Sequence, residues 1–205
     1  MITLHHLRIG RSIFTVWLLE ELDAPYDLKV YHRDPVTMRA SDDLKVIHPL
    51  GKSPAIEDDG LILSESGAIT SYLLEKLDVT HKFAPPRSEL RNWARFTQWL
   101  HYPEGSVFGP LLMKMLLMRS GQSHAVIEAF SNKEITLHLD HIARQLDDHP
   151  YILGDTFSGA DIGVAYVVSM AKRLGQLGSH PTLSAYLERN QGRRAYLRAL
   201  ARAVE

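Results

Sequence analysis

The stretch GKSPAIEDDGLILSESGAI, residues 51–69, constrains the fold more than any other part of the chain. A Ser-Pro step precedes a short apolar run, Asp-Asp-Gly follows that run, and a second apolar run leads into Ser-Glu-Ser-Gly. Asp-Gly between two apolar runs is typical of a tight hairpin turn, because such turns require positive φ angles. Proline has no N–H group and therefore fits the first residue of a strand. The stretch predicts an antiparallel hairpin that leads directly into a helix.

Strand and helix signals alternate in the sequence before this hairpin. The spacing of apolar residues predicts strands over Ile2–Leu7 and Tyr26–Tyr31, separated by a helix over Arg11–Leu22. A short helix is expected at Ser41–Ile47, and a longer one over Ser64–Leu77 follows the hairpin. The resulting order, β-α-β-α-β-β-α, is the thioredoxin arrangement.

The second part of the chain has helical periodicity only. Pro85-Pro86, within VTHKFAPPR, cannot lie inside a helix and marks a linker. The predicted helices after it are Ser88–Arg119 (strained by Pro103 and Pro110), Ser123–Asp147, Ser158–Leu174, Pro181–Arg189 and Arg193–Val204. We therefore predict an α/β plus all-α protein, with a thioredoxin-like domain over residues 1–78, a linker over 79–87 and an all-helical domain over 88–205.

Composition excludes several classes of function. The formal net charge of −1 gives no global attraction to nucleic acid or to anionic membranes. No apolar run is long enough to cross a bilayer and the start lacks the pattern of a secretory signal, so we expect a cytoplasmic protein. The absence of Cys excludes disulfide scaffolds, thiolate zinc sites and a protein thiol nucleophile. The eleven His residues are scattered, and no metal site is expected.

Two groups of residues beside the hairpin could hold a ligand. A cis bond between Ser53 and Pro54 would turn the backbone N–H and C=O of Ser53 outward, where an extended peptide could pair with them. The alternative is an ordinary trans proline, since cis bonds are rare, but the order of elements favours cis. At the next helix start, Glu65 and Ser66 either cap the helix or hold the ammonium and the carboxylate of a ligand. Together these groups describe a receptor for a short anionic peptide with a free amino group.

At this point the sequence resembles the cytosolic glutathione transferases. The stretch HPLGKSPAIEDDGLILSESGAITSYL, residues 48–73, matches the Asn/His-Pro-x-Gly-x-x-Pro…Glu-Ser-x-x-Ile pattern of that family nearly throughout. The start, ITLHHLRIGRSIFTVWLLEELDAPYDLKVYHRD, is similar to a bacterial and fungal branch of serine-type members. The resemblance covers the whole chain. It implies the glutathione transferase fold, glutathione as co-substrate, a small hydrophobic electrophile as second substrate, and a homodimer.

The resemblance also implies a role for each residue of the hairpin region. The backbone of Ser53, held by Pro54, would pair with the cysteinyl unit of glutathione, and Glu65 and Ser66 would hold the γ-glutamyl end. Lys52 would neutralise the glycine carboxylate. His48 would assist at that same end, although both Lys52 and His48 can equally be read as solvated loop charges.

The thiol-activating group departs from the family pattern. In the serine-type branch a hydroxyl at the start of the first helix donates to the glutathione sulfur, and the usual Ser-Arg-Ser reads Gly10-Arg11-Ser12 here. Losing that hydrogen bond costs about 1.5–3 kcal/mol, or roughly one to two pKa units of thiol acidification. The helix dipole and Arg11 would retain a part of the thiol acidification, and Ser12 could turn inward and donate to the sulfur. We expect Ser12 and Arg11 as catalytic residues, weakened activity, and a gain of activity on Gly10→Ser.

Two functions follow from this reading. The first is an enzyme that activates the glutathione thiol for conjugation to, or reduction of, small apolar electrophiles. The second is a non-catalytic glutathione-binding or regulatory protein with the same fold. Thiol-disulfide reductase versions of the fold are disfavoured, because they need a protein cysteine.

The helical domain supplies the remaining expectations. In the family the electrophile pocket lies between the first and fourth helices, and a stripe of Leu and Met there can equally be helix core. The pocket candidates are Tyr102, Phe108, Met113, Leu116 and Leu117, with Trp17. Ser158 and Asp161 have the spacing of a helix capping box, so we interpret Asp161 as structural.

Overall fold

The computed structural model describes residues 1–178 and 180–204, which form two compact units. The first unit contains residues 1–82 together with the chain from residue 192 onward, and the second contains Phe83–Gln191. The predicted division into residues 1–78, 79–87 and 88–205 differs from these units at the C-terminal end. There the last helix, over residues 194–203, belongs to the first unit and not to the helical second unit.

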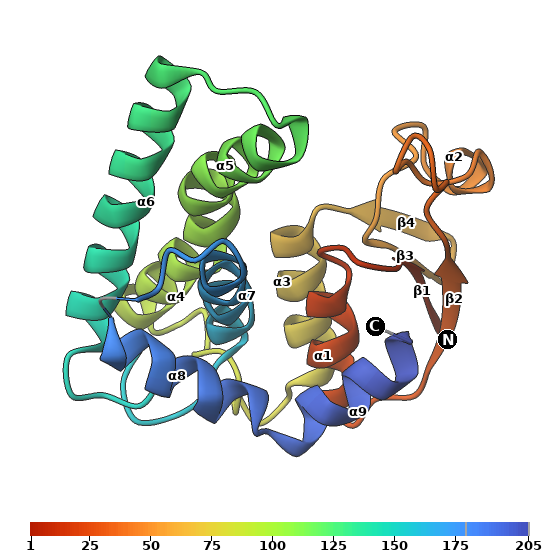
Figure 1. The fold of residues 1–205 in the computed structure, drawn as a ribbon. Helices are drawn as coiled ribbons and strands as arrows, with labels where there is room; N and C mark the ends of the chain where they lie inside the picture. The colour runs from red at the N-terminus through yellow and green to blue at the C-terminus, as the bar shows by residue number, and fades with distance from the viewer. Residues whose placement is uncertain (179, 205) are drawn as a thin grey trace. The chain divides into compact units, whose positions relative to one another are not determined.

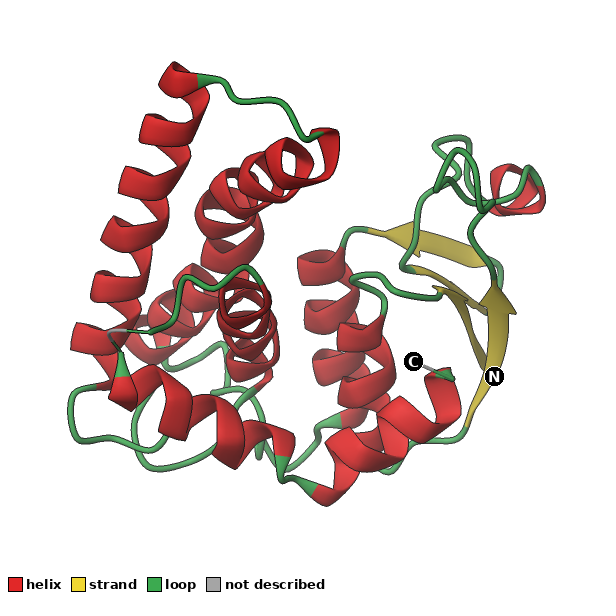
Figure 2. Cartoon of the chain, in the orientation of Figure 1, coloured by secondary structure: helices red, strands yellow, loops and turns green. Residues whose placement is uncertain are grey.

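The first unit contains a four-stranded mixed sheet. Figures 1 and 2 show the sheet together with the helices of this unit. Its strands are β1 (Ile2–Leu7), β2 (Tyr26–Tyr31), β3 (Ala55–Asp58) and β4 (Leu61–Ser64), in the order β2-β1-β3-β4. β1 and β2 are parallel, because α1 (Ile13–Glu21) returns the chain between them; β3 is antiparallel to both β1 and β4. With α2 (Asp43–Ile47) and α3 (Ser66–Leu77), this is the predicted thioredoxin-like arrangement.

α1 is buried on every side, which explains its apolar sequence. All residues from Ile13 to Leu19 are buried, because β1, α3 and α9 (Arg194–Ala203) all contact this helix. α9 presents the small buried residues Ala195, Ala199 and Ala203, which let two helix backbones approach closely.

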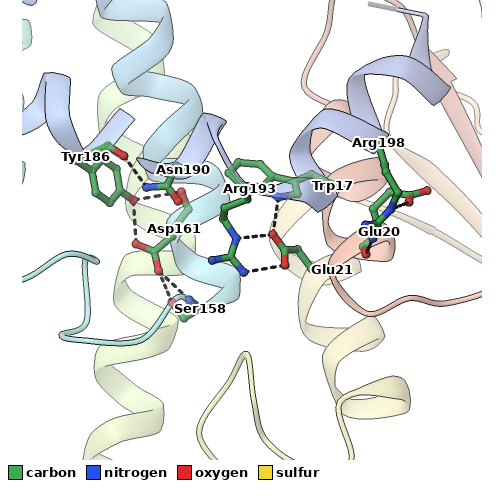
Figure 3. Close-up of polar contacts among 9 residues, drawn as sticks. All are labelled: Trp17, Glu20, Glu21, Ser158, Asp161, Tyr186, Asn190, Arg193 and Arg198. Carbon is green, nitrogen blue, oxygen red and sulfur yellow. Dashed lines mark hydrogen bonds and ion pairs between the residues drawn. The ribbon is translucent and has the colours of Figure 1, made fainter. Parts of the chain in front are cut away.

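Polar contacts lock α9 to the end of α1. The Arg193 guanidinium donates to both carboxylate oxygens of Glu21 at 2.6 and 2.8 Å, and the indole N–H of Trp17 donates to Glu21 at 2.9 Å (Figure 3). The Trp17 ring also makes an edge contact with Tyr196. This docking could not be predicted from the sequence, because charged residues on a short amphipathic helix are typical of a solvated surface.

Helices make up the regular structure of the second unit. They are α4 (Leu90–Tyr102), the π-helical segment η1 (Pro103–Val107), α5 (Phe108–Ser120), α6 (Ala125–Leu146), α7 (Gly159–Arg173) and α8 (Pro181–Gln191). The helix predicted over residues 88–119 therefore exists as a run interrupted at Pro103, where a proline lacks the N–H needed to continue the α-helical ladder. α7 has buried residues around most of its circumference and forms the centre of this unit. None of the helices described is both long and apolar enough to cross a bilayer.

Candidate functional site

Strand register brings the predicted ligand-binding residues to one edge of the sheet. β1 and β4 both run antiparallel to β3, and Ala55 at the start of β3 pairs with His5 and with Ser64. The carboxyl ends of β1 and β4 therefore lie beside the amino end of β3. The turn before α1, the loop before β3 and the start of α3 all emerge at this edge (Figure 1).

Ser53 is anchored by its side chain and leaves its backbone open. The Ser53–Pro54 peptide bond is cis, as predicted. The Ser53 hydroxyl donates to the carbonyl of His5 at 2.7 Å and accepts from the N–H of Leu7 at 3.0 Å. The backbone N–H and C=O of Ser53 have no hydrogen-bond partner within residues 1–178 and 180–204. An extended ligand can pair with them as a further strand would.

Glu65 and Ser66 lie at the start of α3 without capping it. Glu65 is the N-cap residue, and no side-chain cap hydrogen bond is formed there. In the described part of the chain, neither side chain has a hydrogen-bond partner. Glu65 also has φ 71° and ψ 119°, a strained backbone for a non-glycine residue of the kind that clusters at functional sites. The start of α3 thus offers a carboxylate, a hydroxyl and free backbone N–H groups.

The loop before β3 adds His48 and Lys52 to this edge. The Nε2 atom of His48 lies 3.4 Å from the Ser64 hydroxyl, which holds the half-buried imidazole beside the end of β4. Lys52 is exposed, and its ammonium contacts no acceptor among the residues described. Lys52 is therefore available to a ligand carboxylate.

Ser12 is turned into the protein. Its hydroxyl is fully buried and lies 2.9 Å from Nδ1 of His6 and 3.2 Å from both the N–H and the C=O of Leu7. Donation from Ser12 to a ligand outside would require the side chain to leave these partners. Arg11 is half-buried in the same turn.

Gly10 occupies a position without room for a side chain. A Cβ atom there would lie 2.9 Å from the carbonyl oxygen of Leu7 and 3.1 Å from Nη2 of Arg33. The first of these is a backbone atom and cannot move cheaply. The structure thus argues against the simple gain expected from Gly10→Ser, because the serine would displace its neighbours before it could donate.

Arg33 is a residue of this site that sequence reasoning missed. Its guanidinium donates to the carbonyls of Arg8 at 3.1 Å, Ile9 at 2.9 Å and Met38 at 2.9 Å. A single arginine after a strand belongs to no motif, so only the folded chain reveals these contacts.

Histidine side chains in both units are engaged with protein groups. His5 lies between the Tyr31 hydroxyl at 2.8 Å and the Glu57 carboxylate at 2.7 Å, and His138 lies 2.6 Å from the Tyr102 hydroxyl. No three His, Asp or Glu side chains in the described ranges are grouped as metal ligands would be.

The pocket candidates differ in burial. Met113 and Leu116 of α5 are 43% and 54% exposed, so they are surface residues of the second unit rather than its core. Tyr102 is half-buried, and burial raises the pKa of its hydroxyl to about 12. Phe108 and Leu117 are half-buried. Trp17 is 3% exposed and packs within the first unit, where it supports α9.

The predicted capping box at α7 is confirmed. Asp161 is fully buried and accepts from the N–H and the hydroxyl of Ser158 at 2.8 and 2.9 Å. Its other oxygen accepts from the N–H of Ile152 at 2.8 Å and from the hydroxyl of Tyr186 at 2.9 Å (Figure 3). These donors hold the carboxylate in place, so Asp161 is structural.

Comparisons with known proteins agree with this architecture. Residues 1–75 match the N-terminal domain model of glutathione S-transferases, and residues 127–189 match a C-terminal domain model of the same family. Glutathione S-transferase 3 of Schizosaccharomyces pombe is 31% identical over 84% of this chain and 75% of its own length. The disulfide-bond oxidoreductase YfcG of Escherichia coli is 29% identical over 82% of this chain and 77% of its own length.

A solved structure extends the likeness to the whole chain. The crystal structure of a glutathione S-transferase from Actinobacillus pleuropneumoniae superposes with a TM-score of 0.89 at 30% identity, covering 100% of this chain and 93% of that one. Two domain models, a relative above 30% identity and this shared fold lead to one conclusion: the chain belongs to the glutathione S-transferase family.

Proposed function

We propose that the chain is a glutathione transferase that binds glutathione at the edge of the sheet where β1, β3 and α3 meet. The observation that carries this proposal is the start of α3, where Glu65 and Ser66 remain unpaired beside the open backbone of Ser53. The γ-glutamyl end of glutathione has an ammonium and a carboxylate on one carbon. The Glu65 carboxylate suits the ammonium, and the helix N–H groups with the Ser66 hydroxyl suit the carboxylate.

The other binding residues follow along the extended tripeptide. The N–H and C=O of Ser53, fixed by Pro54, would pair with the cysteinyl unit. Lys52 would hold the glycine carboxylate, because its ammonium is exposed and close in sequence to Ser53. His48 would act at the same end, supported by its position beside Ser64.

The cysteinyl sulfur would lie at the start of α1. The positive dipole end of a helix stabilises an anion by roughly 0.3–2 kcal/mol. Arg11 would add a positive charge, and Ser12 would donate to the sulfur only after it leaves His6. The thiolate would then attack a small apolar electrophile.

Disulfide reduction is a second candidate, favoured by the oxidoreductase among the relatives. Since the chain has no cysteine, glutathione itself would have to supply both thiols. One glutathione thiolate would attack a disulfide and expel a thiolate, leaving a mixed disulfide. A second glutathione would then release the remaining thiol and form oxidised glutathione. The relatives give no support to the non-catalytic alternative.

We further propose a homodimer and a cytoplasmic location, as the resemblance to the family implies. Light scattering on the purified chain tests the first, and fractionation of the source cells tests the second. A monomer at micromolar concentration would contradict the dimer.

Three assays on one preparation test the function. Retention on immobilised glutathione tests binding, conjugation to an aryl halide tests transfer, and reduction of a mixed disulfide tests the second candidate. We expect retention and at least one activity. Retention without either activity would favour a non-catalytic glutathione-binding protein, and absence of retention would contradict the proposed site.

A further inference from the structure

Arg33 ties together two loops at the edge of the sheet. It follows β2, and its guanidinium donates to carbonyls of Arg8 and Ile9 in the turn before α1 and of Met38 in the loop after β2. Ile9 and Met38 both have positive φ angles, 54° and 57°, which are uncommon for non-glycine residues. The guanidinium therefore holds two strained segments in one arrangement.

The loop that follows Arg33 is held together by its own hydrogen bonds. The Asp34 carboxylate accepts from the N–H of Val36 at 3.0 Å and from the N–H and the hydroxyl of Thr37 at 2.7 and 2.9 Å. The backbone N–H of Asp34 donates to Arg39 at 2.8 Å, and Met38 donates back to Asp34 at 2.9 Å. These bonds close the loop on itself, so the Met38 carbonyl is presented to Arg33 by a defined turn.

Gly10 fits this arrangement because it has no side chain. Nη2 of Arg33 lies 3.1 Å from the place where a Cβ of Gly10 would stand, and the Leu7 carbonyl lies 2.9 Å from that place. Glycine at this position and the bound guanidinium therefore depend on each other. The permanent charge of Arg33 therefore lies beside Gly10, and Gly10 is two residues before Ser12, the N-cap of α1.

We propose that Arg33 is a positioning residue for thiol activation. It fixes the turn before α1 and places a positive charge beside the start of that helix, and both effects raise the thiolate fraction of bound glutathione. A nearby cation favours the charged form of a thiol, and the helix N-terminus acts in the same sense. The inference rests on the proposed function. It also gives Gly10 a role. Glycine replaces the serine that is usual in the serine-type branch, and the contacts of Arg33 require a residue without a side chain at this position.

The test measures the thiol pKa of glutathione bound to the full-length protein, from thiolate absorbance against pH, and the glutathione Kd by calorimetry. Arg33→Gln removes the charge and the three-carbonyl geometry, so we expect the thiol pKa to rise by about one unit, a tenfold loss of thiolate below the pKa. The Kd at low pH should change much less. Arg33→Lys keeps the charge but not the planar guanidinium group. With this variant, the thiol pKa of bound glutathione should lie between the values for the wild type and Arg33→Gln.

The matched control is Arg39→Gln. Arg39 lies in the same loop, is exposed, and its side chain has no partner among the residues described. This variant loses the same charge from the same loop, and we expect the wild-type thiol pKa.

Gly10→Ala supplies an independent variant. The added methyl group would push the guanidinium and the Leu7 carbonyl apart, so the thiol pKa should rise as in Arg33→Gln. In the double variant with Arg33→Gln, Gly10→Ala should raise the thiol pKa by less than it does in the wild-type background, because both changes disrupt the same contact. If Arg33→Gln does not fold, as judged by thermal unfolding, Gly10→Ala and Arg33→Lys decide the question.

Two results would overturn the inference, and they differ. If the wild type lowers the thiol pKa and Arg33→Gln behaves like Arg39→Gln, the positioning role is wrong while the proposed function stands. If the wild type binds glutathione with an unshifted thiol pKa, or does not bind it, the activation at α1 and the role of Arg33 both fall.

Discussion

Two helix starts in this protein use the same side-chain chemistry in opposite ways. α7 begins with Ser158 and Asp161, and α3 begins with Glu65 and Ser66. At α7 the carboxylate is fully buried and accepts four hydrogen bonds, from Ser158, Ile152 and Tyr186 (Figure 3). At α3 the carboxylate and the hydroxyl have no partner within the described residues.

The difference separates structure from function more clearly than the sequence does. A helix N-terminus has unsatisfied N–H groups, and proteins usually satisfy them with their own side chains. Where they do so, as at α7, the acid stabilises the fold. Where the acid and the hydroxyl stay open and the backbone is strained, as at α3, the groups are left for a ligand. The first three predictions below each test one side of this contrast.

The largest expected effect is on stability, at α7. Asp161→Ala would leave the N–H groups of Ile152 and Ser158 buried without an acceptor, and the Tyr186 hydroxyl would donate only through its longer hydrogen bond, to the backbone carbonyl of residue 161. We expect the free energy of unfolding to fall by about 3–5 kcal/mol in urea titrations. Asp148→Ala, at an exposed position, is the control and should change it by less than about 0.5 kcal/mol. A loss below about 1 kcal/mol for Asp161→Ala would contradict the structural assignment.

The next effect is on binding, at α3. Glu65→Ala removes the partner of the ligand ammonium, so glutathione affinity should fall by about 1.5–3 kcal/mol, or roughly ten- to a hundredfold. The free energy of unfolding should stay nearly unchanged, because the Glu65 side chain has no hydrogen-bond or ion-pair partner among the described residues. Calorimetry measures the first and urea titration the second.

Glu89→Ala is the matched control for that variant, since Glu89 is the N-cap residue of α4 and is also exposed. Its glutathione affinity should equal that of the wild type. Equal affinities of Glu65→Ala and the wild type would remove Glu65 from the site.

Ser66→Ala should give a smaller effect of the same sign. A neutral hydroxyl donor contributes about 0.5–1.5 kcal/mol, so affinity should fall roughly three- to tenfold. Ser71→Ala, a later serine of the same helix, should leave affinity unchanged. A Ser66→Ala variant that binds as the wild type does would assign the ligand carboxylate to the backbone N–H groups alone.

The smallest effect concerns the opposite end of α1. Burial raises the pKa of Glu20, but hydrogen bonds from Arg198 and Tyr26 and the charge of Arg202 outweigh it and hold that pKa below its ordinary value of 4.5. Since the pKa is depressed in the folded state, the stabilisation is fully present above pH 4.5 and is lost as pH falls below it.

We therefore expect the free energy of unfolding of Glu20→Gln to fall less below pH 4.5 than that of the wild type. The difference should be about 1 kcal/mol or less, because Arg198 and Arg202 are partly exposed. Urea titrations across this pH range measure the difference, with Glu188→Gln at an exposed position of α8 as control. Identical pH profiles for the wild type and Glu20→Gln would show that the ion pairs of Glu20 with Arg198 and Arg202 contribute nothing.

Local signals predicted most of the first unit. The Asp-Gly turn, the proline before β3 and the alternating strands specify element types and order, and that order favoured the cis bond before Pro54. Helix spacing likewise predicted the elements of the second unit. The cap at α7 was predicted from the spacing of Ser158 and Asp161, but the residues alone left open whether Glu65 and Ser66 cap α3 or hold a ligand.

Long-range contacts were the part that the sequence could not supply. The packing of Tyr196 and Arg193 against α1 depends on residues more than 170 positions away, with no local signature at either end. Similarly, the sequence shows only that Gly10 lacks the hydroxyl of the usual serine. The fold shows that Leu7 and Arg33 leave no room for a side chain there. The orientation of Ser12 toward His6 also depends on the completed sheet.

The measurement that tests the central claim most directly is the thiol pKa of glutathione bound to the wild-type protein, read from thiolate absorbance against pH. Our account predicts saturable binding and a thiol pKa about one unit or more below the ordinary thiol value of roughly 8.5, because the start of α1 and its neighbouring cations stabilise the anion. Saturable binding with an unshifted pKa would contradict the transferase account, and absence of binding would contradict the site itself.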